Sequence, residues 1–357
     1  MAIRLVDLGT VSYLRSQTVY HGVAYARTDH TPDTILLMNP KEPYVCVGFH
    51  QEVDKEVDMT FCREKGLPVL RREVGGGAVL LDENQMFTQW IMAPDRLPWN
   101  LNKRFQIYAR PLVQTYHAFG IQAEFRPIND IHVSGRKIGG TGAAAIGQAE
   151  VMVGSFLFDF NTELMARVLK VPSEKFRDKV FQSLQEYMTT MKKELQTVPD
   201  REDVKAVYMR ECEKALGEEI VEGELTPDEL ATIETLDEKF QSESWLYQKS
   251  GLMRDGVKIH QDVWVMEAML KARGGLVRAM ARLHHDRIED LSLSGDFTFH
   301  PHRLFTDLEK ALVNVRLEPD AIRERVGQFY EDHDVQTPGV EIEDWVSVLM
   351  SLQQKAE

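Results

Sequence analysis

The sequence has little cysteine, no long apolar run and no excess of positive charge. Its 357 residues include three cysteines, Cys46, Cys62 and Cys212, and no CxxC pair. A disulfide framework is therefore not expected, and a reducing cytoplasm fits this cysteine usage best. No stretch approaches the roughly 20 apolar residues of a membrane span, and the N-terminus lacks the apolar core of a signal peptide. We expect a soluble cytoplasmic protein with no membrane partner.

The charge is distributed unevenly along the chain. The net charge is -14, yet residues 1–150 hold 16 Lys/Arg and 16 Asp/Glu, so the whole acidic excess lies in residues 151–357. Nucleic-acid binding needs a basic face, which neither half offers. A nucleic-acid partner is therefore not expected, whereas local basic pockets for small anions remain possible.

The first 160 residues combine short strand-like runs with helical stretches. The strand-like runs are 34–40, 44–49, 67–74, 78–81, 88–93 and 151–160, and helical patterns cover 12–27 and 103–120, the latter ending at Gly120. Alternation of β-type runs with amphipathic stretches predicts an α+β fold with a mixed sheet.

The remainder of the chain changes character twice. Residues 172–245 are strongly helical and acidic, which is most simply a solvated linker region, with contact to a carrier protein as an alternative. After Trp245 we expect a strand pair, in which 263–282 could instead be helical, and then helices from about Leu304. The predicted domains are a catalytic domain, 1–245, and a smaller α+β accessory domain, 246–357.

The stretch RREVGGGAVLLDEN places two arginines before three consecutive glycines. Gly75, Gly76 and Gly77 leave the backbone bare, so that successive N–H groups can converge on an anion, and Arg71 and Arg72 can fork onto phosphate or carboxylate oxygens. A flexible hairpin tip with surface arginines explains the same residues equally well.

A second stretch, NDIHVSGRKIGGTGAAAIGQ, brings a lysine next to small residues. Ser134-Gly135 predicts a turn between a short strand led by Asp130 and a segment led by Arg136 and Lys137. The lysine ammonium could reach a ligand lying on bare backbone. Taken alone, however, the stretch favours a hairpin with an exposed lysine followed by a packed small-residue helix.

The two stretches together resemble the lipoate–protein ligases of the biotin/lipoate ligase and octanoyltransferase superfamily. The resemblance rests on R-R-x-x-G-G-G-x-V-x-x-D, then N-D, then G-R-K with small residues, and on 45–57 upstream. It extends over the whole chain, because 239–248 looks like the linker before that family's accessory domain and 304–322 like the core of that domain.

The resemblance implies a role for each matching position. Lys137 and Arg72 would be catalytic, with Lys137 on the acyl carbonyl and the adenylate phosphate and Arg72 on the carboxylate and phosphate. The residues that would contact the adenylate, the acyl chain, the nucleotide or its Mg²⁺ are Arg71, Gly75, Gly76, Gly77, Ala78, Val79, Asn84, Asp130, Thr141, Gly142 and Ala143. Leu81 departs from the family, which commonly has histidine before Asp82.

The implied activity is activation of lipoate by ATP to lipoyl-AMP, followed by transfer to a lysine of a carrier protein or lipoyl domain. Attack of a carboxylate on a triphosphate requires neutralised charge, which Arg72, Lys137 and Mg²⁺ would supply. Apolar residues Val45, Val79, Leu80 and Phe156 could line an acyl tunnel, in which each buried methylene contributes about 0.8 kcal/mol. The Leu81 departure and the G-F-H-Q loop point to the branch that serves lipoate-binding proteins of sulfur oxidation.

Two alternatives remain open. An octanoyltransferase acting from acyl carrier protein would need a cysteine near the lysine loop, but none lies between Cys62 and Cys212. A non-catalytic carrier-binding homologue would have little use for both Lys137 and Arg72. No metal site of the protein's own is expected, because the His284-His285 and His300-Pro-His302 pairs lack further Cys or His at ligand spacing.

Overall fold

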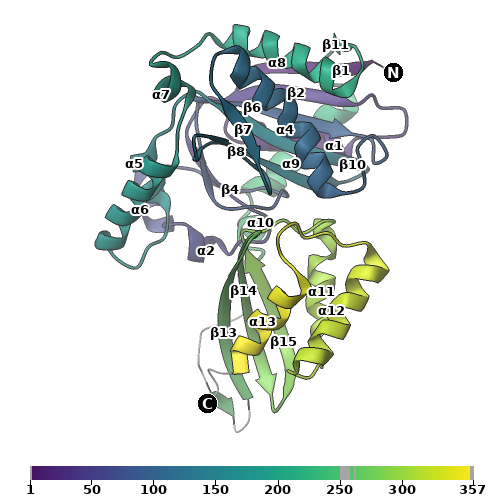
Figure 1. Ribbon diagram of the computed structural model, residues 1–357. Helices are drawn as coiled ribbons and strands as arrows, with labels where there is room; N and C mark the ends of the chain where they lie inside the picture. The colour runs from purple at the N-terminus through teal and green to yellow at the C-terminus, as the bar shows by residue number, and fades with distance from the viewer. Residues whose placement is uncertain (1, 250–257, 261–262, 354–357) are drawn as a thin grey trace. The chain divides into compact units, whose positions relative to one another are not determined.

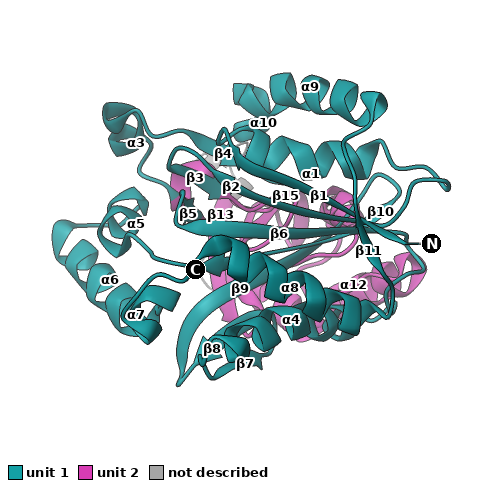
Figure 2. Cartoon of the chain, turned by 90° about the horizontal axis from the view of Figure 1, so that it is seen from above, with its two compact units in different colours: residues 1–46, 57–72, 79–246 teal, residues 47–56, 73–78, 247–357 magenta. Residues whose placement is uncertain are grey.

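The computed structural model describes residues 2–249, 258–260 and 263–353, which form two compact units (Figure 2). Unit 1 comprises residues 1–46, 57–72 and 79–246, and unit 2 comprises 47–56, 73–78 and 247–357. The division after Leu246 lies one residue from the predicted domain boundary. Two short segments of the predicted catalytic domain, 47–56 and 73–78, nevertheless belong to unit 2.

Unit 1 is built on an eight-stranded mixed sheet, as the predicted α+β class requires (Figure 1). Strand β1 pairs in parallel with β2 and with β11, whereas the other paired strands are antiparallel. In sheet order the strands are β11 (Ile220–Glu222), β1 (Ile3–Val11), β2 (Thr34–Pro40), β6 (Gln85–Met92), β10 (Ala149–Leu157), β9 (Arg136–Ile146), β8 (Asp130–Val133) and β7 (Ala123–Arg126).

Helices cover both faces of this sheet (Figure 2). Helices α4 (Leu101–Ala118) and α8 (Arg201–Leu216) lie on one face, and α1 (Arg15–Tyr25) lies on the other beneath α9 (Pro227–Gln241). Val204, Tyr208 and Cys212 of α8 are completely buried in the core. Most of the acidic stretch 172–245 is therefore not a solvated linker region as predicted, because α8 and α9 contribute buried residues to unit 1. The helical residues 174–187 bury only Arg177.

The contact between α1 and α9 depends on a glycine. A Cβ atom at Gly22 would lie 2.3 Å from Ile233 Cγ1 and 3.1 Å from the Ile233 backbone nitrogen, so the two helices can approach only because position 22 has no side chain. Tight packing at such a site resists added volume.

Gly22→Ala should destabilise the protein by about 1–2 kcal/mol, because the cost of overpacking exceeds the gain in helix propensity. Gly327→Ala in α12 (Pro319–His333) is the matched control, since its Cβ would meet only Ile342 Cδ1, at 3.9 Å. That variant should gain up to about 1 kcal/mol from propensity alone. Urea unfolding followed by circular dichroism measures both; shifts of the same sign would contradict the packing argument.

The rest of unit 1 consists of a small sheet and further helices. A three-stranded sheet orders β4 (Val69–Arg71), β3 (Tyr44–Val47) and β5 (Val79–Leu81). Helix α6 (Glu174–Tyr187) begins where the Ser173 side chain accepts a hydrogen bond from Phe176 N. The remaining helices are α3 (Met59–Lys65), α5 (Thr162–Val168), α7 (Met191–Leu195) and α10 (Glu243–Leu246).

Unit 2 contains an antiparallel four-stranded sheet, one face of which is covered by the longer helices of residues 305–353 (Figure 1). The strands are β12 (Lys258–His260), β13 (Val263–Ala272), β14 (Gly275–His284) and β15 (Arg287–Gly295), and the helices are α2 (Val53–Glu56), η1 (His302–Leu304), α11 (Phe305–Leu312), α12 and α13 (Ile342–Gln353). Residues 263–282 thus form two strands joined by a tight turn, not a helix. Parts of the predicted strand pair, 250–257 and 261–262, lie outside the described residues.

No helix in the described part of the chain combines the length and the apolar character that crossing a membrane requires.

Candidate active site

The β8–β9 hairpin presents the lysine that the sequence singles out. Ser134 and Gly135 form its turn with φ of 48° and 80°, the left-handed values typical of a tight hairpin turn. His132 lies directly opposite Lys137, and the register shifts by one residue between Ile131 and His132. Because side chains alternate along a strand, Asp130, His132 and Lys137 share one face, while Ile131 and Ile138 enter the core.

Lys137 and Asp130 form an ion pair on this face. Lys137 Nζ lies 2.7 Å from Asp130 Oδ1, and the two side chains are 30% and 25% exposed, so the pair is half-buried and open to a ligand. A Cβ at Gly140 would lie 3.2 Å from that Nζ, which shows that bare backbone borders the ammonium. The predicted hairpin is present, but Lys137 is not a free surface lysine. The small residues after it form strand β9, not the packed helix that the stretch alone favours.

Thr141, Gly142 and Ala143 follow in the same strand and are buried. Thr141 donates from its N and its Oγ1 to Asn129 O, at 2.8 and 2.9 Å, and the Asn129 amide donates back to Thr141 O. Gly142 and Ala143 pair with β10. These contacts fix the segment that leads into Asp130, and they already occupy the N–H group and the hydroxyl of Thr141.

The two arginines have different environments. Arg71 is fully buried, and its Nε and Nη2 donate to Leu246 O at 3.0 and 2.7 Å. Arg72 is half-buried and donates from Nη1 to Cys46 O at 3.0 Å. Arg71 therefore anchors the end of unit 1, whereas Arg72 keeps the partial exposure that an anion-binding residue needs.

The glycine triplet and Ala78 belong to unit 2. Gly76 N donates to Phe297 O at 3.3 Å, and a Cβ at Gly75 would lie 2.7 Å from the same oxygen. The close approach of two backbones is therefore sufficient to explain glycine at positions 75 and 76, whether or not a ligand binds there. Val79 begins β5 in unit 1, where it pairs with Cys46.

Asn84 lies in the turn between β5 and β6. Its N donates to Asp82 Oδ1 at 2.9 Å, and its carbonyl accepts from Phe158 N at 2.9 Å. Burial raises the pKa of the Asp82 carboxyl. Asn84 bonds to Asp82 and Phe158 rather than to Lys137 or Asp130, so its nucleotide role stays a prediction.

The four apolar tunnel candidates fall into two groups. Val45, Val79 and Leu80 lie on the neighbouring strands β3 and β5. Phe156 instead packs in the core of the large sheet, with its ring centroid 5.2 Å from that of Tyr116 and 5.3 Å from that of Tyr208.

The three cysteines are buried thiols. Burial raises the pKa of Cys62 to about 11 and also raises those of Cys46 and Cys212, the Cys46 shift being opposed by the nearby Arg72. A nucleophilic cysteine needs a lowered pKa and access to substrate, and these thiols have neither.

The histidine pairs are dispersed. His302 Nε2 faces Glu73 Oε2 at 3.6 Å, and His284 stacks edge-on with His285. Across residues 2–249, 258–260 and 263–353 no group of three or more His, Cys, Asp or Glu side chains is arranged to hold a metal ion.

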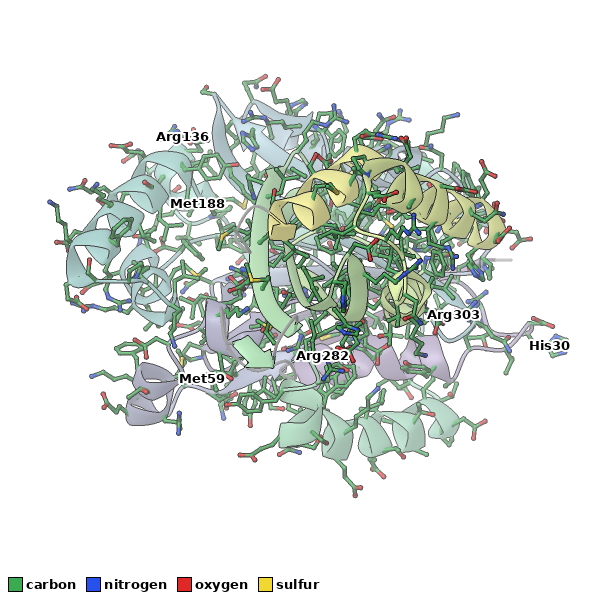
Figure 3. The ribbon with its side chains drawn as sticks, turned by 90° about the horizontal axis from the view of Figure 1, so that it is seen from below. His30, Met59, Arg136, Met188, Arg282 and Arg303 are labelled. Atoms are coloured by element: carbon green, nitrogen blue, oxygen red, sulfur yellow. The ribbon has the colours of Figure 1, made fainter. Side chains whose placement is uncertain are left out.

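Sequence reasoning missed two residues of the lysine site, His132 and Tyr187. Tyr187, the last residue of α6, places its hydroxyl 3.4 Å from Asp130 Oδ2 and 3.3 Å from His132 Nε2. The next residues bind β9 itself, because Met188 bridges to Lys137 and Thr189 N donates to Lys137 O at 2.9 Å. Figure 3 labels Met188 and Arg136, which mark this junction. The D-x-H spacing signals His132, but nothing in the sequence signals Tyr187.

The chain is similar to known proteins that act on lipoyl or octanoyl groups. The lipoyl protein ligase A/B catalytic domain family matches residues 17–213. Lipoate–protein ligase 1 of Staphylococcus aureus is 25% identical over 299 residues, 83% of this chain and 85% of the relative. Octanoyltransferase LipM of Kyrpidia tusciae is 26% identical over 272 residues, 69% and 98% of the two chains.

Solved structures share the fold. Plasmodium falciparum LipL1 in complex with lipoate superposes with a TM-score of 0.68 at 14% identity, covering 100% of this chain and 99% of that one. Lipoate-protein ligase A bound with ATP gives 0.60 at 20% identity, covering 69% and 99%. Since the family match spans more than half of the sequence, the chain belongs to the lipoyl protein ligase A/B catalytic domain family and is a ligase-type enzyme of that family.

Proposed function

We propose that this protein is an ATP-dependent lipoate–protein ligase, which forms lipoyl-AMP and transfers the lipoyl group to a lysine of a carrier protein or lipoyl domain. The observation that carries the proposal is the half-buried Lys137 ammonium, held 2.7 Å from Asp130 beside bare backbone. A fixed cation in such a place can neutralise phosphate in the first half-reaction and the developing oxyanion in the second.

The other residues would share the work of charge neutralisation. Arg72, half-buried next to β3, would bind the carboxylate and phosphate. Mg²⁺ would arrive with the ATP phosphates, and Asp130 and Asn84 would lie near the nucleotide or this metal. Related proteins that bind ATP or lipoate support both as substrates.

The octanoyltransferase alternative rests on the LipM relative. Against it, the sequence has no cysteine between Cys62 and Cys212, and burial raises the pKa of all three thiols. An acyl-cysteine intermediate would thus lack a thiolate in the lysine region.

Pyrophosphate release from ATP-Mg²⁺, measured with and without lipoate, tests the proposal. The ligase requires lipoate-dependent pyrophosphate and a lipoyl-AMP product detected by mass spectrometry. Octanoyl transfer from acyl carrier protein without pyrophosphate would establish the transferase instead. Binding of a carrier domain with neither reaction would identify a non-catalytic homologue.

The acceptor can be determined by offering purified carriers in parallel. A lipoyl domain of a 2-oxoacid dehydrogenase and a lipoate-binding protein of sulfur oxidation differ in the surface around the target lysine. We propose the second as the preferred acceptor, on the basis of Leu81 and the G-F-H-Q loop. Equal or faster lipoylation of the dehydrogenase domain would contradict that preference.

Gly140→Ala should slow adenylation about 10-fold with little loss of stability. The new Cβ would lie 3.2 Å from Lys137 Nζ and 3.6 Å from Asp130 Oδ1, so the flexible lysine must move by a few tenths of an ångström. Small displacements of a reacting group are costly in rate. Pyrophosphate kinetics and a thermal melt measure the two effects. An unchanged rate would show that the ammonium position tolerates displacement.

A further inference from the structure

Tyr187 and His132 surround the carboxylate that pairs with Lys137. Asp130 offers two oxygens, of which Oδ1 binds Lys137 Nζ at 2.7 Å. Oδ2 lies 3.4 Å from the Tyr187 hydroxyl, which in turn lies 3.3 Å from His132 Nε2. The imidazole is completely buried, whereas Tyr187 is 42% exposed. A half-exposed tyrosine thus covers a buried histidine and the second oxygen of the aspartate.

The direction of each hydrogen bond follows from donor and acceptor chemistry. Arg126 Nη1 lies 3.4 Å from His132 Nδ1, and a guanidinium can only donate, so Nδ1 accepts. The neutral imidazole then carries its proton on Nε2 and donates to Tyr187 Oη. The tyrosine hydroxyl is left to donate to Asp130 Oδ2.

The hydrogen bonds therefore run from Arg126 to His132, from His132 to Tyr187 and from Tyr187 to Asp130. Each oxygen of the Asp130 carboxylate has a partner. A carboxylate held at both oxygens cannot rotate freely about its Cβ–Cγ bond. The backbone contact between Thr189 N and Lys137 O, at 2.9 Å, fixes the lysine from the other side. Residues 187–189 thus hold both partners of the ion pair.

We propose that Tyr187 and His132 are positioning residues, which orient Asp130 and through it the Lys137 ammonium; their effect on catalysis rests on the proposed ligase function. Neither residue need touch the substrate. Removing the tyrosine hydroxyl leaves Asp130 Oδ2 with only the more distant His132 Nε2, at 3.7 Å, so the carboxylate can turn and the ammonium loses its fixed place. Turnover then falls, while the KM for ATP changes little.

Tyr187→Phe removes the hydroxyl and keeps the ring, and Tyr25→Phe is its matched control, a tyrosine 41% exposed at the end of α1. The first readout does not depend on ligase activity: acetic anhydride labelling of Lys137, quantified by peptide mass spectrometry. We expect labelling about 5-fold faster in Tyr187→Phe, in line with one lost hydrogen bond, and wild-type labelling in Tyr25→Phe. Equal Lys137 labelling in wild type and Tyr187→Phe would overturn the proposal.

The second readout is adenylation, for which kcat should fall about 5-fold at unchanged KM for ATP. His132→Leu should reproduce both effects, and the double variant should add little, because both residues act through Asp130. Fully additive losses would overturn the shared route. If the wild type releases no pyrophosphate, the proposed function fails, but the labelling experiment still decides whether these residues hold Lys137.

Discussion

Replacing Lys137 by alanine should reduce lipoate-dependent pyrophosphate release at least about 100-fold, the loss typical of removing one preorganised charge-stabilising group. The ammonium is half-buried and already held by Asp130, so little free energy is needed to position it during the reaction. Without the ammonium, only Arg72 and Mg²⁺ would neutralise the negative charge of the phosphates and the carboxylate. The fold should be unaffected, because a half-exposed side chain is lost from the surface of a hairpin.

Two further variants sharpen this experiment. Lys137→Arg keeps the charge but changes its geometry, and should recover only part of the activity. Lys214→Ala removes an exposed lysine of α8 that pairs with Glu211, and should retain wild-type activity. A Lys137→Ala protein that releases pyrophosphate within threefold of wild type would exclude the assigned role. Octanoyl transfer that survives in this variant would point to transferase chemistry elsewhere in the molecule.

Replacing Arg4 by methionine should cost about 3–5 kcal/mol of stability, because it leaves a buried carboxylate without its counter-charge. Arg4 binds Glu229 through both Nη atoms, with Nη1 to Oε2 at 3.1 Å, and donates from Nε and Nη2 to Thr34 Oγ1 at 3.2 and 3.0 Å. Glu229 is 2% exposed. The same carboxylate closes the capping box of α9, since it accepts from Thr226 N at 2.7 Å.

The double variant Arg4→Met/Glu229→Gln should recover much of this loss, because a neutral amide avoids the buried unpaired charge. Arg323→Met provides the surface comparison, since its partner Glu343 is solvent-exposed, and its melting temperature should match wild type. Thermal melts of the four proteins measure the effect. A double variant no more stable than Arg4→Met would show that lost packing, rather than the stranded charge, dominates.

The sequence predicts the α+β class and the lysine hairpin well, because both follow from local patterns. Strand alternation alone places Asp130, His132 and Lys137 on one face once Ser134-Gly135 is recognised as the turn. The strand runs 34–40 and 78–81 correspond closely to β2 and β5. These predictions need only the two-residue period of strands and the chemistry of the turn residues.

Other features depend on contacts that no local pattern encodes. Arg71 and Arg72 are adjacent and chemically identical, yet one is buried on Leu246 O and the other is half-buried on Cys46 O. Tyr187 reaches Asp130 from 57 residues away. Strand β11 is three residues long between charged segments, too short for a periodic signal, and is formed by pairing with β1. Tertiary packing decides each of these cases.

The division of the chain bears on how the two units can move. The backbone passes between them five times, after Cys46, Glu56, Arg72, Ala78 and Leu246. A single flexible joint cannot describe such a connection, because any reorientation must change backbone torsions at several of these points together. A protein ended at Leu246 would also keep 47–56 and 73–78 while losing the apolar neighbours, Phe297 among them, that these segments pack on. Segments of the two units alternate along the sequence, so a single truncation cannot remove the second unit.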